Sequence, residues 1–260
     1  MEFLYLIVAL FATTVGAMSG LGGGIIIKPV LDMLGHYDLA TIGILSSSTL
    51  LAMSIVSLVK RYIEKAKFEY IKLLSLSAGA ILGGFFGKAG FTLFIELISQ
   101  NTAKIIQSIC LTLLMIAILL FSIYREKVKT FHVTNPIICL IAGIILGSIA
   151  VFLGIGGGPI NVAVITILFS SSAKEAAIYS IFTIFFAQGT TILTTAFTTG
   201  FAIYDLEVIG YMIVGGISGG FLGSFFNKKV SNKHVEKVFN FTMILIIAIN
   251  IFNIIQVAMY

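Results

Sequence analysis

The stretch GLGGG at residues 20–24 interrupts an apolar run and is followed directly by IIIKP. The same phrase returns as GIGGG at residues 154–158, followed by PINVAVITILF. Glycine adopts backbone conformations that other residues avoid, and it lets another backbone or a ligand approach closely. Three consecutive glycines inside an apolar segment therefore predict a break between two helices, made twice in this chain.

The composition places those breaks in a membrane. The chain has 260 residues, of which 58% are hydrophobic and 10% charged, and its mean hydropathy is +1.11. Apolar windows of about 20 residues, enough to cross about 30 Å of hydrocarbon, recur along it. A run such as SICLTLLMIAILLFSIY at residues 108–124 is continuous, whereas the strands of a membrane barrel alternate apolar and polar residues. We therefore predict an all-α polytopic membrane protein in a lipid bilayer, with a retained first helix and no soluble domain.

The chain repeats itself. An offset of 134 residues lays the first glycine motif on the second, Ser46 on Ser180 and Thr49 on Thr183. An offset of 136 lays GGFFG at 83–87 on GGFLG at 219–223. We predict two membrane repeats, 1–130 and 131–260, each with four long helices and one short helix after the glycine break. The expected helices span about 3–19, 25–34, 39–59, 70–87 and 104–124, then 136–153, 159–169, 176–199, 206–226 and 238–258.

Basic residues choose between two topologies. If the short pieces do not cross the membrane, the sixteen Lys and Arg residues divide equally between the two sides. If the short pieces count as crossings, thirteen of the sixteen fall on one side, and only Lys28, Lys88 and Lys104 remain. The positive-inside rule favours the second arrangement. Five crossings per repeat then make the repeats inverted, with loops 60–72, 125–129 and 227–237 cytoplasmic and both termini outside the cell membrane. The net charge of +5 is explained by these loops, so no nucleic-acid partner is expected.

The glycine breaks are also the candidate binding site. A helix that begins inside the membrane presents free N–H groups and the positive end of its dipole, which together favour an anion. Two such ends meeting near the midplane would cradle a small anionic substrate. Hydroxyl and amide groups nearby could donate to it, although Ser and Thr also bond to their own helix carbonyls. Lys28 could attract the anion or extend its ammonium to the membrane surface. The predicted substrate-binding residues are Gly22, Gly23, Gly24, Lys28, Ser46, Thr49, Gly156, Gly157, Gly158, Asn161, Ser180, Thr183 and Gln188.

Other glycines have a different expected role. Gly79, Gly83 and Gly87 recur every four residues, as do Gly215, Gly219 and Gly223, which predicts helix faces for close packing. No acidic residue falls in the middle of a long span, so a carboxylate relay for cations or protons is not expected, and Asp32 and Asp38 are left as alternative coupling sites. The sequence also suggests no metal cluster, no cofactor and no enzyme activity.

The two glycine motifs and the helices after them resemble those of a known family. The segments GLGGGIIIKPVLDMLG and GIGGGPINVAVITILF, each followed about twenty residues later by a Ser-containing helix, resemble the TauE/SafE family of sulfite and organosulfonate exporters. The resemblance covers essentially the whole chain. Pro29 stands where the family usually has proline, whereas the second motif has Ala163 there and Pro159 earlier. The resemblance implies a permease for a small sulfur-containing anion, and it favours no single ligand.

The function expected from the sequence is therefore a secondary transporter that binds its anion at the paired breaks. A passive anion channel and a membrane assembly or sensor subunit without transport remain as alternatives. A homo-oligomer is left open, as are the coupling ion and the direction of transport.

Overall fold

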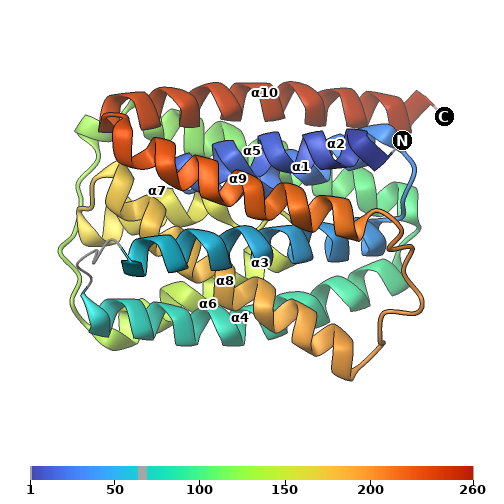
Figure 1. The fold of residues 1–260 in the computed structure, drawn as a ribbon, viewed down its shortest axis with the longest axis horizontal. Coiled ribbons are helices and arrows are strands. Elements are labelled where there is room, and N and C mark those ends of the chain that lie inside the picture. Colours follow the sequence, from blue (N-terminus) through green and yellow to red (C-terminus); the bar gives the residue numbers. More distant parts are fainter. Residues whose placement is uncertain (1, 64–68, 260) are drawn as a thin grey trace.

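The computed structural model describes residues 2–63 and 69–259, and in this part of the chain all regular structure is helical. The helices are α1 (Glu2–Ser19), α2 (Gly24–Leu34), α3 (Leu39–Ile63), α4 (Tyr70–Leu97), α5 (Gln100–Ile123), a single 3-10 turn (Arg125–Lys127), α6 (Pro136–Phe152), α7 (Gly158–Phe169), α8 (Ala173–Phe197), α9 (Ile209–Lys229) and α10 (Asn232–Met259). They lie side by side along the long axis of the molecule (Figure 1).

The helix lengths support a membrane protein. Seven of the described helices are long and apolar enough to span a bilayer, while α6 and α7 are shorter apolar helices. The outward faces are apolar: Phe85 and Phe86 of GGFFG are 51% and 57% exposed, whereas Gly83 and Gly87 beside them are buried. An all-α polytopic architecture is therefore confirmed. Helix α6 matches the expected span 136–153 within one residue, and with 17 residues it is the shortest of the described helices that were expected to be long.

One boundary differs from expectation by several turns. The helix expected to end near residue 87 continues as α4 to Leu97, because the residues after Gly87 contain no proline and only one further glycine, Gly90. It stops before Ser99, whose hydroxyl accepts a hydrogen bond from Thr102 N and caps α5. Glu96, expected in a connector, therefore lies in the last turn of α4.

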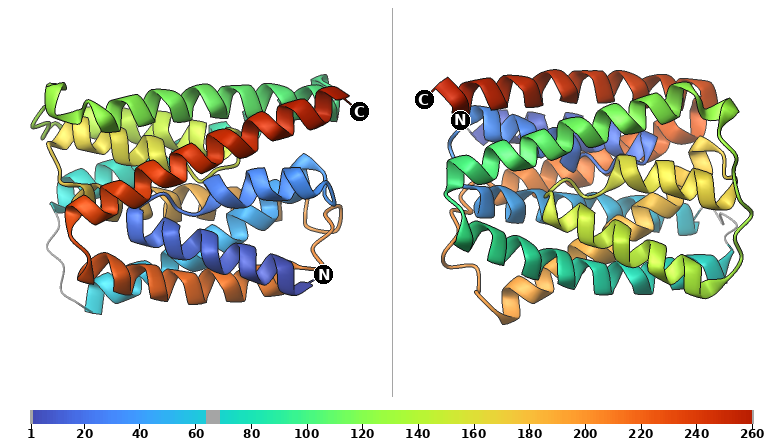
Figure 2. Two further views of the ribbon diagram at one scale, coloured as in Figure 1. Left: turned by 90° about the horizontal axis from the view of Figure 1, so that it is seen from above. Right: turned by 180° about the vertical axis from the view of Figure 1, so that it is seen from behind.

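The two short helices reverse the chain direction. The hydroxyl of Tyr5, near the start of α1, lies 2.6 Å from Nδ1 of His36, which follows α2. A backbone hydrogen bond closes the second hairpin at the corresponding place: Val133 N, before α6, donates to Leu168 O at the end of α7 at 2.9 Å. The α1–α2 and α6–α7 hairpins open toward opposite ends of the molecule, and both chain termini lie at one end, which we call the terminal end (Figures 1 and 2).

Glycine faces bring the hairpins together. Helix α4 packs on α6, and α1 packs on α9, with α3 and α8 between these pairs. A Cβ placed on Gly83 would lie 2.3 Å from Ile144 O of α6, and one on Gly219 would lie 2.7 Å from Leu10 O of α1. The backbones therefore touch along these faces, and the predicted packing role of the four-residue glycine pattern is confirmed.

This packing makes a stability prediction. Gly83→Ala should destabilise the protein by about 1–3 kcal/mol, because the added methyl group overlaps a carbonyl of α6. Gly90→Ala, on the same helix, is the matched control, since its Cβ would meet nothing nearer than Phe152 Cδ2 at 3.7 Å. Thermal unfolding in detergent should give a lower midpoint for Gly83→Ala and an unchanged or higher one for Gly90→Ala. Equal midpoints for the two variants would contradict the packing described here.

Candidate substrate site

Both glycine breaks have the same unusual backbone. Gly23 and Gly157 are the N-caps of α2 and α7, with φ of 79° and 73° in the left-handed region. L-residues with a side chain rarely adopt this conformation, so glycine is required. The other positive φ values in the two breaks are at Gly20, Gly22, Gly154 and Gly156.

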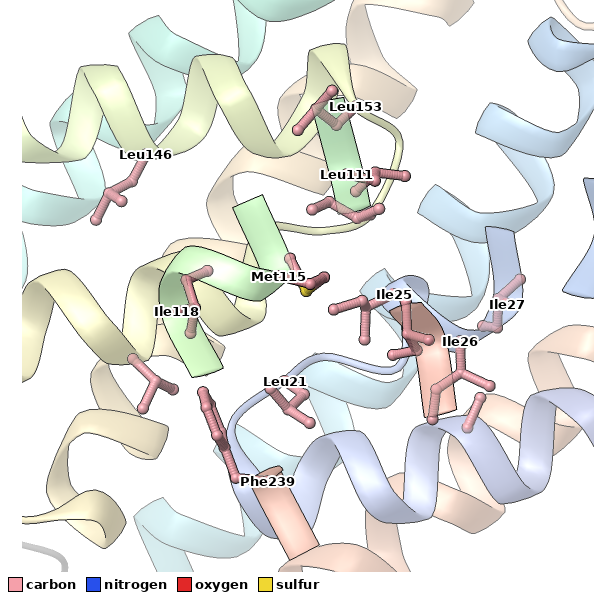
Figure 3. Close-up of a cluster of buried hydrophobic side chains, with 14 of the residues drawn as sticks. Leu21, Ile25, Ile26, Ile27, Leu111, Met115, Ile118, Leu146, Leu153 and Phe239 are labelled. Atoms are coloured by element: carbon pink, nitrogen blue, oxygen red, sulfur yellow. The ribbon is translucent and has the colours of Figure 1, made fainter. Parts of the chain in front are cut away.

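The two breaks pack directly on each other. A Cβ on Gly158 would lie 1.8 Å from Leu21 O, and a Cβ on Gly24 would lie 2.6 Å from Ile155 O. Leu21 of the first break thus contacts Gly158, the first residue of α7, and Ile155 of the second break contacts Gly24, the first residue of α2. Leu21 and Ile155 are both fully buried. Figure 3 shows Leu21 in the same buried cluster as Met115 and Phe239.

Two of the predicted serines hold these breaks. The hydroxyl of Ser180 donates to Gly20 O at 2.7 Å, and that of Ser46 donates to Gly154 O at 3.4 Å. Each serine therefore binds the carbonyl at the start of a break that belongs to the other half of the chain. The hydroxyl protons are engaged with protein in this conformation, which gives Ser46 and Ser180 a positioning role.

The two predicted threonines bond within their own helices. Thr49 Oγ1 donates to Leu45 O at 2.7 Å, and Thr183 Oγ1 donates to Tyr179 O at 3.0 Å. A hydroxyl has one proton, so neither is left to donate to a ligand here. This is the alternative that the sequence left open for Ser and Thr.

Lys28 is buried beside the second break and already has a counter-ion. It is 2% exposed, and its Nζ lies 2.7 Å from Asp32 Oδ2, one helical turn away. A Cβ on Gly154 would lie 3.2 Å from Lys28 Cδ, so the lysine stem covers that glycine. The ammonium does not extend to the surface, and Asp32 balances its charge.

Two buried amides flank the second break without a partner. Asn161 is fully buried, and neither its Oδ1 nor its Nδ2 makes a hydrogen bond. Gln188 is 2% exposed, and its Nε2 is likewise unpaired, close to where a side chain on Gly156 would point. An unpaired buried polar group costs about 1–3 kcal/mol, so such groups are rare unless a ligand or water binds them.

A pocket approaches the second break from the terminal end. It is a small cavity of about 20 Å³, and we call it the Lys88 pocket; its lining includes Lys28, Gly43, Ser47, Lys88, Gly154 and Thr191. Lys88, Ser47 and Thr191 were not among the predicted site residues. In the sequence, Lys88 stands out as one of the three basic residues, with Lys28 and Lys104, that lie outside the side of the membrane expected to carry the other thirteen.

A second hollow, which we call the Arg125 pocket, lies on the other side of the breaks. Its lining includes Ser19, Arg125, Val162, Thr166, Ala173 and Glu236. Ser19 ends α1 directly before the first break, while Arg125 begins the 3-10 turn after α5, whose C-terminal end lies opposite the chain termini (Figure 2). Arg125 pairs with Glu236 of α10 and donates to Ser171 O at 2.9 Å. One pocket therefore reaches Gly154 of the second break, and the other reaches Ser19, directly before the first break.

A bundle of apolar helices with broken helices and buried polar groups at its centre defines a polytopic membrane protein of the transporter class. The chain belongs to the sulfite exporter TauE/SafE family, whose description, "Sulfite exporter TauE/SafE", it matches over residues 5–251. It is therefore a membrane transporter and not an enzyme.

Named relatives agree with this assignment. The chain is 24% identical to "Probable membrane transporter protein YunE" of Bacillus subtilis, with 95% of this chain and 96% of the relative covered. It is 26% identical to a "Probable membrane transporter protein" of Haemophilus influenzae, over 88% of this chain and 86% of the relative. No solved structure matches it significantly.

The serine contacts yield a prediction about the breaks. Ser180→Ala leaves the buried Gly20 carbonyl without its 2.7 Å hydrogen bond and should cost about 1–3 kcal/mol. Ser46→Ala removes a 3.4 Å contact and should cost less. Thermal unfolding midpoints of the two variants in detergent measure the difference. A larger loss for Ser46→Ala would contradict the assigned contacts.

Proposed function

We propose that this transporter moves a small sulfur-containing anion, such as sulfite or an organosulfonate, across the cell membrane. The anion is bound beside the second glycine break and is exposed alternately to the Lys88 pocket and the Arg125 pocket. Family membership supports the substrate class, and the arrangement of the breaks supports the mechanism.

The unpaired amides of Asn161 and Gln188 carry this proposal. Three of their polar atoms have no hydrogen-bond partner, although both side chains are almost completely buried. Amide N–H groups can donate to a sulfur oxyanion without the cost of desolvating a full charge. A bound oxyanion would accept hydrogen bonds from Asn161 Nδ2 and Gln188 Nε2, the two donors among these atoms.

The two pockets support alternating access. The Lys88 pocket ends at Gly154, and the Arg125 pocket reaches Ser19 beside the first break. Rocking of one half against the other would part the reciprocal contact at Gly24 and Gly158, and it would connect one pocket at a time to the amides. The bonds of Arg125 to Glu236 and Ser171 hold the opposite side together in the present conformation.

The helix directions support inverted repeats. The α1–α2 hairpin opens to the terminal end and the α6–α7 hairpin to the opposite end (Figure 2). We propose that residues 1–130 and 131–260 are inverted repeats. The ends near 125–129 and 227–237 are then cytoplasmic, as the positive-inside rule requires, and both termini are outside.

Transport by amide variants tests the proposal. Asn161→Leu and Gln188→Leu should raise the KM for sulfite efflux from proteoliposomes about tenfold or more, because each removes a hydrogen bond to a charged ligand. Their unfolding midpoints should stay the same or rise, since an unpaired buried amide is replaced by an apolar group. Thr195→Val is the matched control. Thr195 is also buried and unpaired, on the same helix as Gln188, and its replacement should leave KM unchanged.

Other outcomes separate the alternatives. Unchanged KM in both amide variants, with folded protein, would remove the amides from the site. Flux that never saturates and shows no counterflow would favour a passive channel. No flux of sulfite, methanesulfonate or thiosulfate from correctly oriented protein would overturn the permease.

A further inference from the structure

Lys88 is a buried cation without a carboxylate partner. Three lysines are buried in the part of the chain that the structure describes: Lys28, Lys72 and Lys88. Lys28 pairs with Asp32 at 2.7 Å, and Lys72 pairs with Glu69 at 2.8 Å. Lys88 is 7% exposed and has no acidic group within 4 Å among the described residues. An unbalanced ammonium at this depth is costly and marks a functional site.

The ammonium of Lys88 lies near an aromatic ring. Its Nζ lies 5.8 Å from the centre of the Tyr204 ring, which belongs to the loop between α8 and α9. A cation over an aromatic face gains only a modest attraction, which falls short of balancing a buried charge. The site therefore retains an excess positive charge.

Uncommitted donors converge in the Lys88 pocket. The hydroxyl of Ser47, which lines the pocket and is 6% exposed, makes no hydrogen bond with the described residues. Thr191 differs, because its Oγ1 donates to Ala187 O at 3.0 Å and has no proton left. A Cβ on Gly43 would meet no atom within 4 Å, so there is open space at the α3 wall. Lys88 of α4 and Ser47 of α3 therefore line the same open space.

The nearby carboxylates are committed elsewhere. Asp32 is bound to Lys28, so that pair adds no net charge. Asp38 accepts from Thr41 N at 2.8 Å and caps the start of α3. Asp38 keeps its own negative charge, but none of the described acidic groups lies within 4 Å of Lys88, so this ammonium can pair directly with one negative charge. A second negative charge on the ligand would be left buried and unpaired, at a large desolvation cost.

We propose that the Lys88 pocket is a binding site for a singly charged oxyanion, with Lys88 as its counter-ion and Ser47 as a hydrogen-bond donor. The binding claim stands on the pocket alone. Its role in transport, as the site from which the anion reaches Gly154 and the second break, rests on the proposed function.

Ligand-dependent thermal unfolding of the purified full chain in detergent tests the binding claim. The probes, at constant ionic strength, are methanesulfonate, which carries one charge, sulfate, which carries two, and neutral dimethyl sulfone. Methanesulfonate should raise the unfolding midpoint saturably, sulfate should bind at least tenfold more weakly, and dimethyl sulfone should have no effect.

Four variants locate the site. Lys88→Met should weaken methanesulfonate binding at least tenfold, whereas Lys88→Arg should keep it within about threefold. Gly43→Leu fills the open space at the α3 wall, so it should fold normally and lose the saturable shift. Lys104→Met on α5 removes the same charge away from the pocket and should bind as the wild type does.

Each failure has its own meaning. Unchanged affinity in both Lys88→Met and Gly43→Leu would overturn the pocket, as would an equal shift with dimethyl sulfone. Equal binding of sulfate would overturn the single-charge assignment. Lys88-dependent binding without flux of sulfite, methanesulfonate or thiosulfate in proteoliposomes would keep the pocket and overturn the permease. Saturable flux with an unchanged KM in Lys88→Met would keep the permease and overturn the pocket's role in transport.

Discussion

The reciprocal backbone contact between the two glycine breaks is the constraint on which the rest of the structure depends. Gly158 lies against the carbonyl of Leu21, and Gly24 lies against that of Ile155, at distances that leave no room for a side chain. Two reversed hairpins can meet this closely only if their long helices are also held at close range. The glycine faces of α4 on α6 and of α1 on α9 provide that support, so both sets of glycines serve one assembly.

On our proposal this contact is also the barrier between the Lys88 pocket and the Arg125 pocket. The polar groups beside the breaks are of two kinds. Ser46 and Ser180 are bonded to the breaks themselves and hold their shape. Asn161 and Gln188 are unbonded, and on our proposal they are kept for the anion. On this proposal the serine hydroxyls position the breaks, and the amides bind the anion.

The sequence predicted the features that depend on local composition. Helical spans, the glycine breaks and the packing faces follow from hydropathy and glycine spacing, and the structure contains them. The ion pair of Lys28 and Asp32 also has a local basis, because residues four apart on a helix lie on the same face. The bonds of Ser46 and Ser180 to the opposite break depend on how two distant segments meet, which no local pattern encodes. The place of Lys88 in a pocket could not be predicted, because it depends on the continuation of α4 past Gly87, which turns this residue inward.

The most direct test of the central claim is the accessibility of each pocket from each side of the membrane. Single cysteines at Ser47 and Thr166, with Cys110 and Cys139 replaced by alanine, would be treated with a membrane-impermeant thiol reagent in oriented vesicles. Our account predicts that Ser47→Cys reacts from the side of the termini and Thr166→Cys from the opposite side, and that sulfite shifts the two rates in opposite directions. Reaction of both cysteines from the same side would contradict a barrier formed by the glycine breaks.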